Sequence, residues 1–207
     1  MNKLLLPLLS GSFCLILLYS CGAGNVSVKQ ERFHRTGIGA QEKAAILLER
    51  YVDNNQRKDS EEKERQLVDC LRQEMTAGDR VIETLSADDF RTTLFPGVTF
   101  EHAPRSPGAL LDWMKKDDVQ NRVSAMNVRY LIVVDIRNSA RRSTYRATIL
   151  DARNRVASGT ASSDFTGRVG SGLPLLSGTE REACAGLGKA VYNFILSEEG
   201  PAPVKTQ

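Results

Sequence analysis

The segment that most constrains the fold is the run from Arg129 to Arg137, whose centre Tyr130-Leu131-Ile132-Val133-Val134 is apolar without interruption. A strand with one wet face alternates polar and apolar residues, whereas a continuously apolar strand is covered on both faces. This run is therefore predicted to be a central strand. Helices on one or both faces of its sheet would complete the core.

Two further strands are predicted to follow the central strand after short polar turns. They are expected over Thr144–Leu150 and Val156–Ser162, with turns that begin at Asn138 and at Asp151. Links of this length favour antiparallel neighbours, so the three strands should form a meander. The last strand is rich in small polar residues and could be an unpaired edge that accepts a strand from another chain.

Two long amphipathic helices are predicted, one over Ser60–Ala77 and one from Thr179 to just before Gly200. Each begins with a capping signal and carries an apolar stripe along one face. Shorter elements lie between the helices: a strand at Arg80–Leu85 and helices that begin near Ser86, Ser106 and Asp117.

The stretch of residues 44–52 fits either a helix or a strand. Apolar residues at positions 44, 47, 48 and 51 have helical spacing, whereas the dense run ending in Tyr51-Val52 resembles a strand. We favour the strand, because polar residues follow and a clear helix then begins. The predicted fold is α/β (α+β), a single mixed sheet flanked by helices in the order β-α-β-α-β-β-β-α.

The chain begins with a segment typical of exported proteins. Lys3 supplies a positive charge, an apolar core extends to Tyr19, and the small residue Ser20 precedes Cys21. The core is too short for a membrane span and is interrupted by Pro7 and Gly11.

The tetrapeptide Leu18-Tyr19-Ser20-Cys21 resembles a bacterial lipobox. This resemblance implies a signal peptide at 1–20, palmitate or a similar acyl chain on Cys21, and a lipid anchor in the membrane. The alternatives are an ordinary secretory signal and an uncleaved anchor. Gly22, where inner-membrane lipoproteins often have Asp, favours the outer membrane with the protein facing the periplasm. The predicted organisation continues with a lipidated tether at 21–40, one globular domain at 41–198 and a disordered tail at 199–207.

This assignment predicts the state of each cysteine. Cys14 is removed with the signal peptide and Cys21 carries lipid, so Cys70 and Cys184 remain in an oxidising compartment. Both lie on the inward stripes of predicted helices, and two cysteines allow only one pairing. A Cys70–Cys184 disulfide and a pair of buried thiols both remain open.

The sequence offers no convincing catalytic or metal centre. His34 and His102 lie in separate loops, so no metal-ligand spacing exists. The Gly186–Lys189 run lacks the first glycine and the Ser/Thr of a phosphate loop and lies within a helix. Gly170-Ser171-Gly172 lacks the strand–turn–helix context of a nucleophile elbow. We therefore expect no enzyme, no metal and no cofactor, with a hydrolase of degenerate site as a remote alternative.

Arginines cluster around the two predicted turns of the meander. The chain has 28 basic and 25 acidic residues, and the leader removes only Lys3, so its balance gives no reason to expect a nucleic-acid partner. Guanidinium groups suit phosphates and carboxylates, which makes the cluster a candidate anion site; the alternative is a set of solubilising turn residues. If the meander forms, Arg137, Arg141 and Arg142 should lie at one end of the sheet and Arg153 and Arg155 at the other, with Arg146 between them. The cluster comprises Arg137, Arg141, Arg142, Arg146, Arg153 and Arg155.

With the lipobox, the strand Tyr130–Val134, the Leu150-Asp151 turn and the closing helix, the chain resembles bacterial envelope lipoproteins. Their domain is similar to the curli-secretion lipoprotein and to the TolB amino-terminal domain. The resemblance spans roughly Ala44–Leu196 and implies a non-catalytic lipoprotein that binds, or helps to assemble, another envelope component. Pore formation of the curli type is not implied, because the chain lacks alternating segments of about nine to eleven residues. A second hypothesis is binding of a small ligand, lipid or lipopolysaccharide by the Gly167–Gly178 loop and nearby arginines.

Overall fold

The computed structural model describes residues 25–49, 60–98, 103–104, 106–138, 142–166 and 178–198. The strands are β1 (Val26–Arg32), β2 (Lys43–Glu49), β3 (Thr84–Leu85), β4 (Val128–Asn138), β5 (Ser143–Asp151) and β6 (Val156–Phe165). The helices are α1 (Ser60–Ala77), α2 (Ala87–Leu94), α3 (Pro107–Met114), α4 (Asp117–Ala125) and α5 (Gly178–Leu196).

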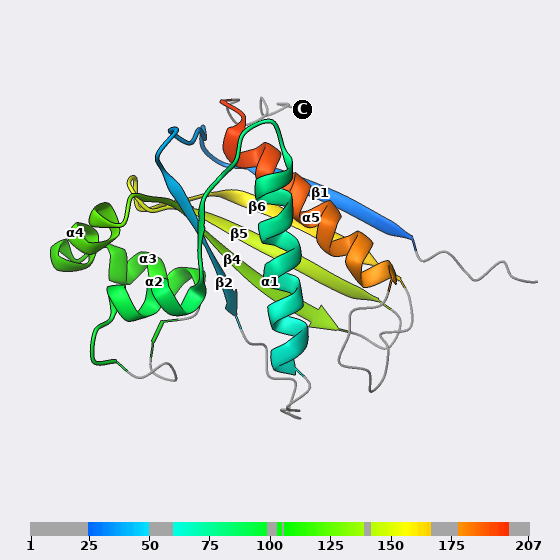
Figure 1. Cartoon of the computed structure of the whole chain (residues 1–207), viewed down its shortest axis with the longest axis horizontal. Coiled ribbons are helices and arrows are strands. Elements are labelled where there is room, and N and C mark those ends of the chain that lie inside the picture. The colour runs from blue at the N-terminus through cyan, green and yellow to red at the C-terminus, as the bar shows by residue number, and fades with distance from the viewer. Residues whose placement is uncertain are drawn as a thin grey trace, which may run out of the picture.

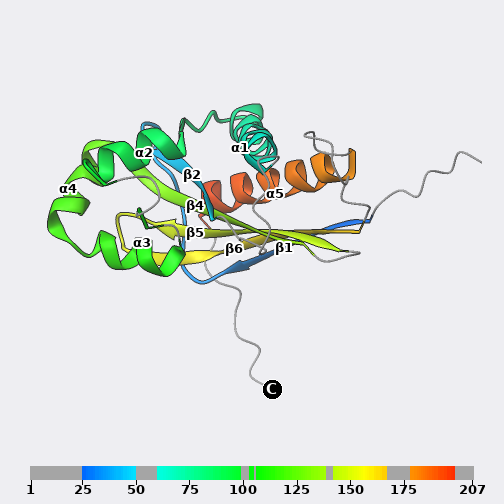
Figure 2. The same ribbon diagram turned by 90° about the horizontal axis from the view of Figure 1, so that it is seen from below.

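The strands form one mixed sheet in the order β1-β6-β5-β4-β2-β3. Helices α1 and α5 lie side by side over one face (Figure 1), and Figure 2 shows α3 on the other side of the sheet. The fold class predicted from the sequence, a single mixed sheet flanked by helices, is therefore confirmed. Among the described residues, no helix has the length and apolar character needed to cross a bilayer.

Strand β4 lies at the centre of the sheet, between antiparallel β5 and parallel β2. Its five apolar residues from Tyr130 to Val134 are each at most 1% exposed. Tyr130, Ile132 and Val134 enter the core beneath α1 and α5, whereas Leu131 and Val133 enter a second core beneath α2–α4. The continuous apolar run thus reflects cover on both faces, as predicted.

The ambiguous stretch 44–52 begins as a strand, which the sequence analysis favoured. β2 runs from Lys43 to Glu49 and pairs with β4 on one side and with β3 on the other. Ala44 and Ile46 face the first core and Ala45 and Leu47 face the second. A strand covered on both faces has no polar stripe, so its sequence cannot be distinguished by periodicity from a buried helix. Residues 50–52 lie outside the described residues.

Strand β1 corrects two predictions. Val26–Arg32 falls within the predicted tether 21–40, yet it pairs antiparallel with β6 from Val26–Phe165 to Arg32–Gly159. The tether was therefore wrong over this stretch, and β6 is not an unpaired edge. β1 is an edge strand that needs apolar side chains only toward α5, where Val26 packs against the core, so its composition is mostly polar.

The predicted strand Arg80–Leu85 is also shorter in the structure. Only Thr84 and Leu85 form β3, which pairs with Ala44 and Ala45 of β2. Ile82 lies outside the ladder but is buried in the core beneath α1 and α5, and its N–H donates to the carbonyl of Met75. Burial of the Ile82 side chain, and not strand pairing, therefore accounts for the apolar residue in the middle of the predicted strand.

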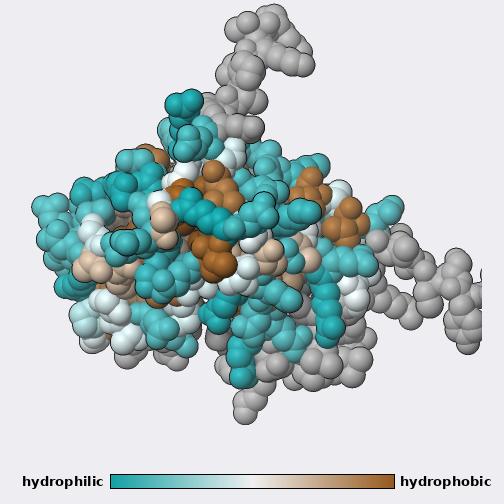
Figure 3. All heavy atoms as spheres, turned by 45° about the horizontal axis from the view of Figure 1, so that its top comes forward, coloured by the Kyte–Doolittle hydropathy of each residue, from teal (hydrophilic) through white to brown (hydrophobic). Residues whose placement is uncertain are grey.

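Figure 3 shows a mostly hydrophilic surface on which hydrophobic atoms form small groups. The large apolar side chains that are exposed among the described residues are Val28, Phe33, Val81 and Val98. They come from separate segments of the chain, and single exposed apolar residues are normal on a water-facing surface.

Candidate binding surface

Among the described helices, α2–α4 cover only part of the second sheet face, and the side chains that they leave uncovered on β1, β6, β5 and the end of β4 are mostly polar. Tyr145 and Ala147 of β5 face the core beneath α1 and α5, so the alternating residues Thr144 and Arg146 face the other way. The register aligns three rows of side chains across the strands. We call these side chains the open polar face: Arg137, Thr144, Asp164 and Ser27; Asp135, Arg146, Ser162 and Lys29; Thr148, Thr160 and Glu31.

A hollow of about 560 Å³ lies on the open polar face. Three cationic side chains, two carboxylates and three hydroxyl groups contribute to its lining, together with Gln30. Small-molecule sites of similar volume are mostly apolar and enclose their ligand. A polar and open hollow is better suited to part of a larger partner that brings its own polar groups.

The Asp164 carboxylate is mostly buried in this surface and interacts with the side chains of Thr144 and Arg142. Its carboxylate accepts a 2.5 Å hydrogen bond from the Thr144 hydroxyl and lies 2.7 Å from Nη2 of Arg142. The Thr144 hydrogen bond and then the Arg142 charge lower the pKa of this carboxyl. The Asp164 side chain is 13% exposed but that of Arg142 is 58% exposed.

At Asp135, too, a buried carboxylate is paired with an exposed guanidinium group. Nε of Arg137 donates to the Asp135 carboxylate at 3.0 Å, with side-chain exposures of 60% and 10% respectively. Glu49 also lies near this pair, and burial, followed by the Asp135 charge, raises its pKa despite the opposing effect of Arg137. Because the carboxylates lie beneath and the guanidinium groups lie outside, the outer layer here is cationic.

The structure places the described arginines of the candidate anion site at two ends of the sheet, with Arg146 between them. Arg137 and Arg142 flank the pair Asn138–Ser143 at one end, Arg146 pairs with Asp135 three rows further in, and Arg141 lies outside the described residues. Arg153 and Arg155 follow β5 at the opposite end of the sheet, where Arg153 forms an ion pair with Glu42. The five arginines of this cluster that the structure describes therefore do not form a single site.

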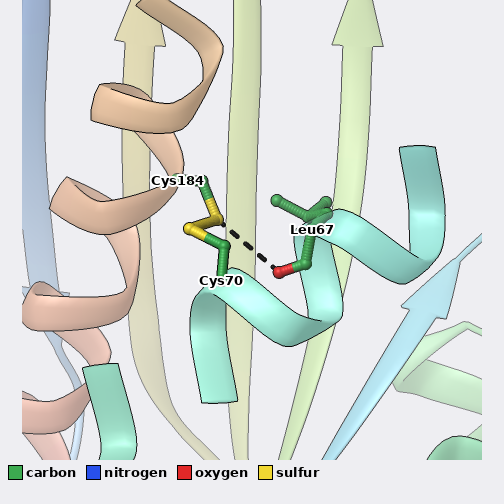
Figure 4. The surroundings of a disulfide bond; sticks show 3 residues. All are labelled: Leu67, Cys70 and Cys184. Carbon is green, nitrogen blue, oxygen red and sulfur yellow. Dashed lines mark hydrogen bonds between the residues drawn. A yellow bond between two sulfur atoms is a disulfide. The ribbon is translucent and has the colours of Figure 1, made fainter. Parts of the chain in front are cut away.

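The Cys70–Cys184 disulfide is present in the structure. It joins α1 to α5 with a Cα–Cα separation of 6.3 Å (Figure 4). Sγ of Cys184 lies 3.5 Å from the carbonyl oxygen of Leu67, a contact in which an oxidised sulfur has no proton to donate. The bond bridges the two helices, with Cys184 buried in the core and Cys70 partly buried against it, and has a structural role.

The other motifs that the sequence analysis considered give no reactive site in the described part of the chain. Gly186 and Gly188 lie inside α5, where a Cβ would meet Val28 of β1 at 3.0 Å and the side chain of Glu74 in α1 at 2.7 Å, respectively. These glycines allow α5 to pack closely between β1 and α1. His34 is exposed, and the described residues contain no group of three or more His, Cys, Asp or Glu that could hold a metal. His102 and residues 170–172 lie outside the described residues.

Sequence reasoning missed most of the open polar face. Lys29 and Glu31 were placed in a tether, and Thr160, Ser162 and Asp164 were not recognised as one side of a strand. The alternation Val26-Ser27-Val28-Lys29 was the available signal for β1. It is only four residues long, and pairing with a strand more than 120 residues away cannot be seen in it.

Comparison with known proteins gives no family. No protein-family model matches the chain, and no curated protein sequence matches it. Among solved structures, the chain is similar to the PelC dodecamer from Paraburkholderia phytofirmans, with a TM-score of 0.45 and 12% identity over 84% of this chain and 100% of that one. It is also similar to TolB from Acinetobacter baumannii, with a TM-score of 0.38 and 10% identity over 83% of this chain and 31% of that one. TolB is one of the two proteins to which the sequence was likened.

Proposed function

We propose that this protein is a lipid-anchored envelope protein, without catalytic activity, that binds another envelope component through the open polar face. The observation that carries the proposal is that part of one sheet face has none of the described helices over it and presents matched rows of charges and hydroxyl groups. The leader and the lipobox-like tetrapeptide support the anchor, and Gly22 after Cys21 supports the outer-membrane location.

The shape of the surface favours a protein partner over a small molecule. The hollow is open and polar, so it cannot supply the apolar enclosure on which small-ligand affinity usually depends. Asp135 holds the guanidinium group of Arg137 in the lining of the hollow, and Asp164 holds that of Arg142 beside it, which lowers the entropy lost when a partner binds. Carboxylates on a partner suit such preorganised guanidinium groups.

The partner test compares variants with equal changes in charge. The full, lipidated protein is crosslinked in cells and captured with wild-type sequence, with Arg146→Glu or with Lys189→Glu. Lys189 is exposed on α5, which covers the other face of the sheet, so it is a matched control. We expect a stoichiometric partner with wild type and Lys189→Glu and at least a tenfold loss with Arg146→Glu. Equal capture by all three proteins would contradict the proposed surface.

The anchor is tested separately. The amino-terminal peptide of the exported protein should begin at Cys21 and carry the mass of acyl chains, and outer-membrane fractions should contain the protein. Cys21→Ala should abolish both the added mass and the membrane attachment. An unmodified Cys21 would refute the anchor but leave the binding surface standing.

Binding of a lipid or lipopolysaccharide phosphate is the second candidate. The cationic outer layer formed by Arg137, Arg142 and Arg146 favours it, because guanidinium groups bind phosphate well. A protein that purifies as a monomer with bound lipid, and with no stoichiometric partner, would favour this function over the first.

A further inference from the structure

The start of β1 and the exposed side chains of Arg137 and Arg142 lie at the same end of the sheet. Val26 at the start of β1 pairs with Phe165, Phe165 pairs with Ser143, and Ser143 pairs with Asn138. Beyond this row, the Thr166 N–H donates to the Asn25 carbonyl at 3.2 Å. We call this the arginine end of the sheet, because Arg137 and Arg142 flank the same row.

The length of the chain keeps the arginine end close to the anchor. Asn25 follows Cys21 by four residues, which span at most about 14 Å when fully extended. β1 cannot lengthen this link without breaking its ladder to β6. Two contacts also fasten β1 to α5: Gln30 donates to the Ala190 carbonyl at 2.9 Å, and Arg32 donates to the Phe194 carbonyl at 3.1 Å.

We propose that the arginine end faces the membrane that holds Cys21, and that Arg137 and Arg142 bind the phosphates of anionic headgroups there. The inference rests on the anchor of the proposed function and adds an orientation and a lipid chemistry to it. Both side chains are more than half exposed, while the carboxylates of Asp135 and Asp164 lie beneath them. The layer that meets the membrane is therefore cationic.

The opposite end of the sheet supplies an internal control. Arg153 and Arg155 lie beyond the last residue of β5, and the nine residues of β5 span about 27 Å. The field of an anionic membrane decays over about 8 Å at physiological ionic strength. Arginines at that end should therefore contribute nothing to membrane contact.

Fluorescence quenching can test the orientation. The full, lipidated protein is reconstituted in phosphatidylcholine vesicles, with or without phosphatidylglycerol, that contain a headgroup-linked quencher. A fluorophore is attached at Ser27→Cys near the arginine end or at Asn154→Cys near the opposite end; both positions are exposed. We expect strong quenching at position 27 and little at position 154. Equal quenching at both positions would overturn the orientation.

Charge variants test the phosphate contact. Each arginine near an anionic surface should favour the membrane-bound orientation about fivefold. With phosphatidylglycerol, Arg137→Gln/Arg142→Gln should therefore lower this preference about 25-fold, and Arg153→Gln/Arg155→Gln should leave it unchanged. Wild type in about 1 M salt, where the screening length is about 3 Å, should behave like the first pair. A response that is equal for both pairs, or independent of phosphatidylglycerol and salt, would overturn the phosphate contact.

The same samples separate this inference from the anchor. The mass of the amino-terminal peptide reports acylation of Cys21 in each preparation. Acylated protein with equal quenching at the two labelled positions refutes the orientation alone, whereas unacylated protein refutes the proposed anchor and the orientation that depends on it.

Discussion

Reduction of the Cys70–Cys184 disulfide should lower the stability of the domain by a large amount without unfolding it. The bond closes a loop whose ends are 114 residues apart. In the chain-entropy model, a cross-link of that span lowers the entropy of the unfolded chain enough to stabilise the fold by about 4.8 kcal/mol at 25 °C. For a domain of this size, each kcal/mol corresponds to about 2–4 °C in melting temperature. The expected fall is therefore about 10–19 °C.

The reduced protein should remain folded at room temperature because α1 and α5 have other contacts. Leu67 and Leu71 of α1 share a core with Leu187 and Val191 of α5. In addition, the Tyr192 hydroxyl donates to the Arg80 carbonyl and accepts from the Arg80 N–H, both at 3.0 Å. These contacts do not need the sulfur–sulfur bond.

Thermal unfolding of the full protein in detergent, followed by circular dichroism with and without reductant, measures the effect. Cys70→Ala/Cys184→Ala is the matched control, and its melting temperature should resemble that of reduced wild type and should not respond to reductant. If reduction lowers the melting temperature of wild type by no more than the 2–4 °C expected for about 1 kcal/mol, the loop-entropy reasoning is wrong. A reduced protein without secondary structure would show instead that the helix contacts are insufficient.

Further predictions concern packing and pH. A Cβ at Gly159 would collide with the Glu31 carbonyl and the Phe194 ring. Gly159→Ala should therefore lower the free energy of unfolding, measured in urea, by about 3 kcal/mol. A decrease below about 1 kcal/mol would show that β1 can shift to accommodate the methyl group. A Cβ at Gly108 in α3 would meet nothing within 4 Å, so Gly108→Ala should leave stability unchanged or raise it by up to about 1 kcal/mol. The folded-state pKa of Asp164 is lowered, so its contribution to stability is present above the unfolded value of about 3.9 and is lost as the pH falls through the folded value. Asp164→Asn should therefore be less stable than wild type at pH 7, by a difference that shrinks below about pH 4 in parallel unfolding curves; a constant difference would contradict the assigned hydrogen bond and ion pair.

The elements that the sequence predicted well are those whose burial is recorded in local composition. The central strand β4 has an apolar run that only cover on both faces explains. Helices α1 and α5 have apolar stripes at helical spacing, and Cys70 and Cys184 lie on those stripes, which made their pairing open to prediction. In each case a few neighbouring residues carry the information.

The elements that were missed depend on contacts between distant parts of the chain. β1 is mostly polar because an edge strand buries little, and its strand conformation comes from the ladder to β6. The open polar face is invisible for the same reason, since its rows combine residues from four strands. β6 could be interpreted as an edge because nothing in its own sequence indicates that β1 pairs with it.

The position of β1 has the largest consequence for function. A tether reaching from Cys21 to residue 40 could extend over about 60 Å, and a domain on such a tether would turn freely above the membrane. With β1 in the sheet, the link from Cys21 ends at Asn25 and extends over at most about 14 Å, so the proposed anchor would hold one end of the sheet at the height of the headgroups. β1 then runs away from the proposed anchor beside β6. Asp164, Ser162 and Thr160 therefore lie at increasing distances from the start of β1. A partner in the periplasm and the headgroups of the membrane would therefore contact different parts of one continuous polar surface.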